Sequence, residues 1–283
     1  MRRALAALAA GALLLPGCAT APPAALEGRI WDVRAGQFID EGALLARLRA
    51  ARYRLLGEVH DHPQHHALRA RLIERLAPAD IFFEPFDREH DAALRAAQAA
   101  GGDADALARA GRLDRKAWGW PLHRPLLEAA LRAGHAVRAA NLSRADARRI
   151  VQSGRVEGAA LPAWPAEAEA RLRREIEDAH CGALPAKMAP AMALAQRARD
   201  AAMAQALASA AGPAVLIAGN GHVRRDLGVP RYLPAGAGVL SVGFLEVRAG
   251  EADPGAYAPQ AYDYAWFTLP QSRPDPCEAF RKP

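Results

Sequence analysis

Short apolar runs alternate with helical stretches along most of the chain, and this alternation restricts the fold more than any other feature of the sequence. The runs typical of buried strands are residues 53–56, 80–84, 135–140, 214–218 and 238–247, followed by 262–268. Helical patterns occupy residues 64–77, 88–100, 122–133, 144–152, 166–180 and 189–210. Strand-helix-strand alternation predicts an α/β fold with a mostly parallel sheet flanked by helices. The final run, 262–268, is predicted to be an edge strand.

One long segment interrupts this alternation. Residues 155–212 contain no strand candidate and include two of the helical patterns. We therefore expect a single α/β domain over residues 27–283, with a helical insertion that forms a flap subdomain over the carboxyl edge of the sheet.

The first residues have the features of an export signal. Arg2 and Arg3 precede an apolar stretch at 4–15 that is too short to be a stable membrane span. Leu15-Pro16-Gly17-Cys18 then resembles a bacterial lipobox. These features predict a lipoprotein signal peptide at 1–17, lipidation of Cys18, a tether at 18–26 and anchoring in the outer membrane. The alternative is an ordinary secretory signal with an incidental cysteine.

The distribution of charge argues against a nucleic-acid partner, and the cysteine content predicts a disulfide. The formal net charge is +6, but the arginines are scattered and mixed with acidic residues, so no stripe suits nucleic acid. With Cys18 assigned to lipid, Cys181 and Cys277 remain. Two cysteines in an exported protein predict one disulfide bond, and two buried thiols are the alternative.

Two of the predicted strands end in glycine-histidine turns, at residues 57–60 and 219–222. Glycine allows a sharp turn and close approach of a ligand, and the carboxyl edge of a parallel sheet is where such folds place their sites. Four side chains are therefore expected in one crevice: Glu58, His60, Glu84 and His222. The structural alternative is that the carboxylates pair with arginines or cap helices.

A second cluster carries chemistry of another kind. Trp118 and Trp120 flank a glycine and precede His123, an arrangement that can form a flat apolar slot with an axial ligand and suits a porphyrin. His62 and His66, four residues apart on a predicted helix, are rival ligands. The tryptophans can equally pack in the core. No two-cysteine heme-attachment motif is present, so any heme would be held non-covalently.

Several motifs, in order, resemble the ChaN family of heme-binding lipoproteins implicated in iron uptake. They are Leu56-Gly57-Glu58-Val59-His60-Asp61, Trp118-Gly119-Trp120-Pro121, Ala140-Asn141-Leu142, residues 196–204, and Ala218-Gly219-Asn220-Gly221-His222. The resemblance implies an α/β fold shared with erythromycin esterases and Tiki-type metalloproteases. It also implies heme as the cofactor, a heme-bridged homodimer, and an outer-membrane receptor as a partner. Members of the family often carry tyrosine where this chain has His123, which leaves the iron ligand open.

Two hypotheses about function follow. In the first, the chain is an outer-membrane-anchored heme-binding lipoprotein of iron and heme acquisition. His123, or else His62 or His66, coordinates iron, and both tryptophans pack on the porphyrin.

The alternative is a metal-dependent hydrolase. Glu58 acts as the general base, His60 and His222 hold a divalent metal, and Glu84 orients them. Catalytic zinc normally has three protein ligands, and the sequence does not single out the third.

Overall fold

The computed structural model describes residues 26–158 and 161–278. The predicted signal peptide, the lipidation site Cys18 and nearly all of the tether lie outside the described residues. Within the described residues, no helix combines the length and the apolar character needed to cross a membrane.

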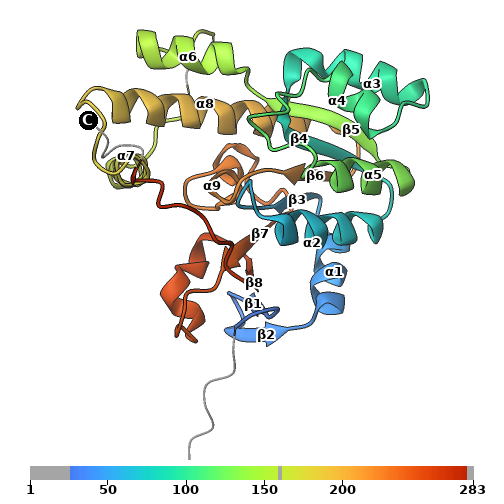
Figure 1. The fold of residues 1–283 in the computed structure, drawn as a ribbon, viewed down its shortest axis with the longest axis horizontal. Coiled ribbons are helices and arrows are strands. Elements are labelled where there is room, and N and C mark those ends of the chain that lie inside the picture. The colour runs from blue at the N-terminus through green and yellow to red at the C-terminus, as the bar shows by residue number, and fades with distance from the viewer. Residues whose placement is uncertain (1–25, 159–160, 279–283) are drawn as a thin grey trace, which may run out of the picture.

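The described part of the chain forms one eight-stranded sheet with the order β2-β1-β8-β7-β3-β6-β4-β5 (Figure 1). The strands are β1 Ile30–Asp32, β2 Gln37–Ile39, β3 Tyr53–Leu56, β4 Asp80–Asp87, β5 Ala136–Asn141, β6 Ala214–Ile217, β7 Val239–Glu246 and β8 Tyr264–Thr268. The six strands from β8 to β5 are parallel, and β1 and β2 add an antiparallel hairpin. The predicted mostly parallel α/β sheet is confirmed.

The prediction that 262–268 is an edge strand is wrong. β8 pairs in parallel with β7 on one side and antiparallel with β1 on the other, and all five of its residues are buried. The β1–β2 hairpin covers it and takes the edge position itself. Each hairpin strand is three residues long, which is too short to show a readable alternation of apolar and polar residues.

Helices cover the sheet. They are α1 Glu41–Ala50, α2 Pro63–Glu74, α3 Asp91–Ala99, α4 Ala104–Ala110, α5 Arg124–Arg132, α6 Arg144–Ser153, α7 Ala166–Ala179, α8 Met188–Ala208 and α9 Asn220–Val223. The helical patterns in the sequence anticipate α2, α3 and α5–α8. The unpredicted α1 and α4 begin after Asp40 and Asp103, whose carboxylates accept from the amides of Ala43 and Ala106. Such aspartates are a local signal for a helix start.

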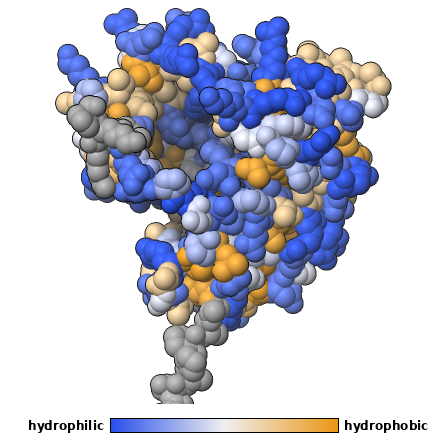
Figure 2. Space-filling view, viewed as in Figure 1, coloured by the Kyte–Doolittle hydropathy of each residue, from blue (hydrophilic) through white to orange (hydrophobic). Residues whose placement is uncertain are grey.

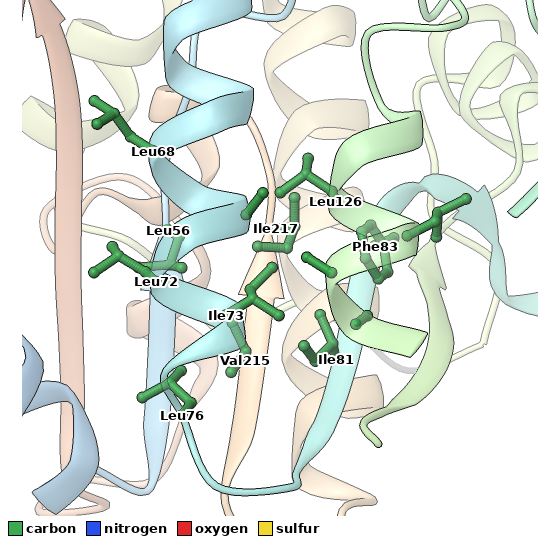
Figure 3. Packing of buried hydrophobic residues seen from close by; sticks show 14 of the residues in the cluster. Leu56, Leu68, Leu72, Ile73, Leu76, Ile81, Phe83, Leu126, Val215 and Ile217 are labelled. Carbon is green, nitrogen blue, oxygen red and sulfur yellow. The ribbon is translucent and has the colours of Figure 1, made fainter. Parts of the chain in front are cut away.

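Two apolar layers form because successive strand residues point to opposite faces. On one face Leu56, Ile81 and Ile217 pack against side chains of α2 and α5 (Figure 3). On the other face Leu55 and its neighbours pack against Met203 of α8. The carboxyl half of α8 therefore belongs to the sheet's cover.

The predicted helical segment 155–212 contains α7 and α8, and α7 packs on α8 rather than on the sheet. A C-terminal strap, residues 269–277, runs from the end of β8 towards α7 (Figure 1). Cys277 in this strap is joined by a disulfide to Cys181, just beyond α7, with 5.7 Å between the Cα atoms. The pairing is the one the sequence predicts.

The strap is also held at its other end. The ring of His62 donates through Nε2 to the carbonyl of Leu269 at 2.8 Å. Arg273 binds Asp61 at 2.6 Å and Glu246 at 2.6 Å. The strap thus connects α7 to the turn that follows β3.

Candidate functional site

A cleft of about 720 Å³ opens where β3, β4, β5 and β6 end. The hollow is visible in Figure 2, where hydrophilic side chains surround most of it. All four residues predicted to share a crevice line it: Glu58 and His60 after β3, Glu84 in β4, and His222 in α9. The parallel strands bring these ends to one edge, as expected for the fold.

Glu58 is the buried anion at one side of the cleft floor. Its Oε1 lies 2.7 Å from Nδ1 of His60, and its Oε2 contacts the guanidinium of Arg69. Arg69 is fully buried on α2, and burial lowers its pKa to about 9. The guanidinium therefore remains charged at neutral pH and balances Glu58.

His60 carries the accessible imidazole of the cleft. Its side chain is 47% exposed. The ring stands edge-on to Trp118, with 4.8 Å between the ring centroids. In the described residues Nε2 makes no hydrogen bond, whereas Nδ1 faces the Glu58 carboxylate. Gly219 lies so close that a Cβ there would stand 3.2 Å from Nε2.

His222 forms a separate buried group with two carboxylates. Its Nε2 lies 3.2 Å from Glu84 and its Nδ1 lies 2.6 Å from Asp200 on α8. Burial alone would lower the pKa of His222, but the two carboxylates raise it to about 10. Burial would raise the pKa of Glu84, but the His222 cation and the amide of Gly219 hold it well below its usual range. His222 is therefore protonated at neutral pH.

Residues 44–233 match the family model described as "Haem-binding uptake, Tiki superfamily, ChaN". The chain belongs to this family. Among solved structures it is similar to ChaN of Campylobacter jejuni, described with cofacial heme binding, at a TM-score of 0.71 and 20% identity. The match covers 84% of this chain and 95% of that chain, and it supports the α/β fold.

Two other solved structures match the chain with lower TM-scores. The type III effector HopBA1 matches at a TM-score of 0.42 and 14% identity, over 81% of this chain and 92% of that chain. A Bacillus cereus protein matches at a TM-score of 0.42 and 11% identity, over 72% of this chain and 68% of that chain. No curated protein matches the chain significantly.

The three histidines predicted as iron ligands all lie below the surface in this ChaN-family protein. His123 is 2% exposed, and burial together with the charge of Arg69 lowers its pKa to about 3. His66 is 1% exposed and donates through Nε2 to the carbonyl of His60 at 2.8 Å. His62 is occupied by the strap. None of the three lines the cleft.

The two tryptophans are placed differently. Trp118 lines the cleft and stands edge-on to both His60 and the buried His123. Trp120 does not line the cleft, and the guanidinium of Arg115 lies 5.0 Å from the centre of its indole ring. Trp118 alone is thus in a position to touch a cleft ligand.

The divalent metal considered from the sequence finds a poor set of ligands here. Both ring nitrogens of His222 already face carboxylates, Nε2 that of Glu84 at 3.2 Å and Nδ1 that of Asp200 at 2.6 Å. Ligand atoms of Glu58, His66 and His123 lie within 4.8 Å of one another, yet Arg69 contacts Glu58 and donates to Nδ1 of His66 at 3.0 Å. The guanidinium already supplies the positive charge that an ion would bring.

Sequence reasoning missed two groups of site residues. Asp200 and Gln196, which contact His222, are four residues apart on α8, a spacing that places them on one helix face. Arg112, Arg144 and Arg199 line the cleft. Arg144 pairs with Asp114 at 2.9 Å, whereas Arg112 and Arg199 have no ion pair within the described ranges. Their position at the rim of the cleft, which depends on the tertiary fold, distinguishes these arginines from the others on the surface.

Proposed function

We propose that this ChaN-family protein binds ferric heme in the cleft, with His60 as the axial ligand of iron. The observation that carries the proposal is the exposed imidazole of His60, held through Nδ1 by Glu58. Family membership supports heme as the ligand. The hydrolase alternative gains no support from the family, and both ring nitrogens of His222 are already engaged by carboxylates.

The pair of His60 and Glu58 has the chemistry that an iron ligand needs. A carboxylate only accepts hydrogen bonds, so the proton of the neutral ring sits on Nδ1 and the lone pair is on Nε2. A carboxylate behind a histidine ligand fixes the ring and raises its basicity, which favours the ferric state. His123, the leading ligand from the sequence, has no such route to the cleft.

The rest of the cleft fits an amphipathic dianion. Its volume of about 720 Å³ lies in the range of small-molecule sites. Trp118 offers an aromatic edge, and the unpaired Arg112 and Arg199 can bind the two propionates by charge-assisted hydrogen bonds. Bound heme supplies an iron coordination position, while the protein supplies the imidazole, the counter-charges and the apolar contact.

The test is a titration of the purified protein with hemin, followed by visible absorption, in wild type, His60→Ala and His123→Ala. We expect a saturable Soret shift in wild type and in His123→Ala, and its loss in His60→Ala. Loss in His123→Ala with retention in His60→Ala would overturn the ligand assignment. An absence of any saturable shift in wild type would overturn the heme function.

We further propose that Cys18 anchors the protein by lipid in the outer membrane, where it serves in heme and iron acquisition. The lipobox-like sequence at 15–18 supports this. Labelling of cells with a palmitate analogue should mark the wild type and not Cys18→Ala, and only the wild type should fractionate with outer membranes. Labelling of Cys18→Ala, or wild type found free of membrane, would contradict the anchor.

A heme-bridged homodimer is part of the same proposal. His60 would contact one face of the porphyrin, and the open side of the cleft leaves the other face for a second copy. Sedimentation velocity with and without hemin tests this. We expect dimer only with hemin, and a monomer that stays monomeric at saturating hemin would contradict it.

A further inference from the structure

A second hollow, of about 420 Å³, lies between α6 and α8 and adjoins the cleft. Five of its lining residues form what is here called the apolar shelf: Ala147, Val151, Met188, Met192 and Ala195. The second hollow and the cleft share three lining residues, Arg144, Gln196 and Arg199. A ligand seated in the cleft can therefore extend onto the shelf without leaving the protein surface.

Of the five shelf residues, Met188 is exposed, Val151 and Met192 are partly exposed, and the two alanines are buried beneath them. Met188 is 36% exposed, and Leu269 is the other large apolar side chain exposed in the ranges the structure describes. Methionine side chains are flexible and polarizable, and they make favourable contacts with aromatic rings. A concave site lined by apolar side chains with a few polar groups is typical of a ligand site.

Charge around the shelf selects the kind of ligand. Arg148 and Arg199 also line the second hollow, and neither forms an ion pair within the described residues. Apolar contact flanked by free guanidinium groups fits a molecule with an apolar body and carboxylates at its edge. Continuity with the cleft of His60 selects a wide, flat body over a single acyl chain.

We propose that the apolar shelf binds the porphyrin macrocycle itself, so that the protein also binds iron-free porphyrin carboxylates without His60. The inference rests on the proposed heme function. It separates two tasks: His60 recognises the metal, and the shelf recognises the ring, together with Arg148 and with Arg199, which lines both the cleft and the second hollow. The chemical class of the second ligand is thus a metal-free tetrapyrrole with propionate side chains.

Protoporphyrin IX is the probe, titrated into the full chain and followed by quenching of tryptophan fluorescence. We expect saturable binding in wild type and in His60→Ala, with dissociation constants within about twofold of each other. Met192→Glu places a charge on the shelf and should weaken binding at least about tenfold. Met192→Leu should restore it, and Leu269→Glu should leave it unchanged. Circular dichroism of each variant shows whether it is folded.

Each contrary outcome has a separate meaning. Equal weakening by Met192→Glu and Leu269→Glu would overturn the shelf as the site. Displacement of protoporphyrin IX by equimolar palmitate would overturn the macrocycle as the occupant in favour of an acyl chain.

Hemin titrations of the same samples separate this inference from the proposed function. His60-dependent binding of hemin without binding of protoporphyrin IX would leave the heme function standing and refute the shelf. Binding of protoporphyrin IX with no saturable hemin binding would refute the heme function alone.

Discussion

His60 and Glu58 are two residues apart on the turn after β3, and the imidazole Nδ1 lies 2.7 Å from the carboxylate Oε1. One partner is almost half exposed and the other is buried against Arg69. The turn therefore connects the cleft surface to a charge pair inside the protein. Substitutions near His60 should therefore change heme binding, whereas substitution of Glu58 should change the stability of the fold.

Replacement of Gly219 by alanine should weaken heme binding. The new Cβ would stand 3.1 Å and 3.2 Å from atoms of the His60 ring, so the ring has to move. Overpacking of this kind costs about 1–3 kcal/mol, which, where it opposes the ring position that binds iron, corresponds to roughly 5- to 150-fold in affinity. Gly221→Ala is the matched control, because a Cβ at Gly221 meets nothing within 4 Å. Hemin titration of both variants measures the effect, and equal affinities would contradict the close approach.

Glu58→Gln should destabilise the fold strongly, because it leaves the buried guanidinium of Arg69 without its counter-charge. Removal of one partner of a buried ion pair costs about 3–5 kcal/mol. Asp61→Asn is the control, since Asp61 is 56% exposed and its pair with Arg273 is worth at most about 1 kcal/mol. Urea unfolding compares the two. Similar losses in both variants would show that Arg69 is not balanced by Glu58.

The sequence allowed the positions of the central strands to be predicted, but not which histidine reaches the solvent. β3 and β6 are short, mostly apolar runs, with Arg54 the one charged residue, and a glycine follows each within two residues, so their bounds can be predicted from the local sequence. The β1–β2 hairpin is too short for such a pattern. His60 and His123 are both polar residues near apolar neighbours in the sequence. Trp118 contacts both rings in the fold, and only tertiary packing places one in the cleft and the other beneath the surface.

Stability should fall as the pH rises above neutrality. Although burial opposes it, Glu84 and Asp200 raise the pKa of His222 from 6.5 to about 10. The attraction between protonated His222 and its two carboxylates stabilises the fold fully below pH 6.5. This contribution is lost as the pH rises through about 10. The free energy of unfolding should decrease between pH 7 and 10 by up to about 1.4 kcal/mol per unit. Urea titrations at each pH measure this decrease.

Two variants check the source of this pH dependence. His222→Gln should flatten the profile between pH 7 and 10, because the titrating group is gone. Asp200→Asn should move the loss of stability to lower pH, since one of the two charges that raise the pKa of His222 is removed. A wild-type slope that survives in His222→Gln would assign the effect to another group.

His123→Leu should leave the protein as stable as wild type or slightly more so. Both ring nitrogens of His123 are buried and have no hydrogen-bond partner within the described residues. Their burial costs solvation, and the nearby Glu58 Oε1 lies 3.6 Å from Nε2, beyond hydrogen-bond distance, so an apolar side chain of similar size removes a penalty of about 1 kcal/mol or less. Thermal unfolding measures the change. A loss of several kcal/mol would mean that His123 makes a polar interaction that stabilises the fold.

Removal of the disulfide by Cys181→Ser with Cys277→Ser should lower stability by about 2–4 kcal/mol. The bridge closes a loop between residues separated by 96 positions, and long loops gain most from closure. Urea unfolding of the double variant measures the loss, and wild type treated with dithiothreitol should show the same midpoint. An unchanged midpoint in both would mean that the contacts of His62 and Arg273 secure the strap without the disulfide.

The strap follows every strand of the sheet in chain order, while its covalent partner Cys181 precedes β6. During synthesis from the amino end, α7 is complete long before Cys277 emerges. The link between α7 and the turn that carries His60 is therefore made after the sheet's last strand has been added. A ribosome-bound chain that lacks the strap has the sheet's strands but not this brace, which closes only after synthesis, when Cys181 and Cys277 are oxidised to the disulfide.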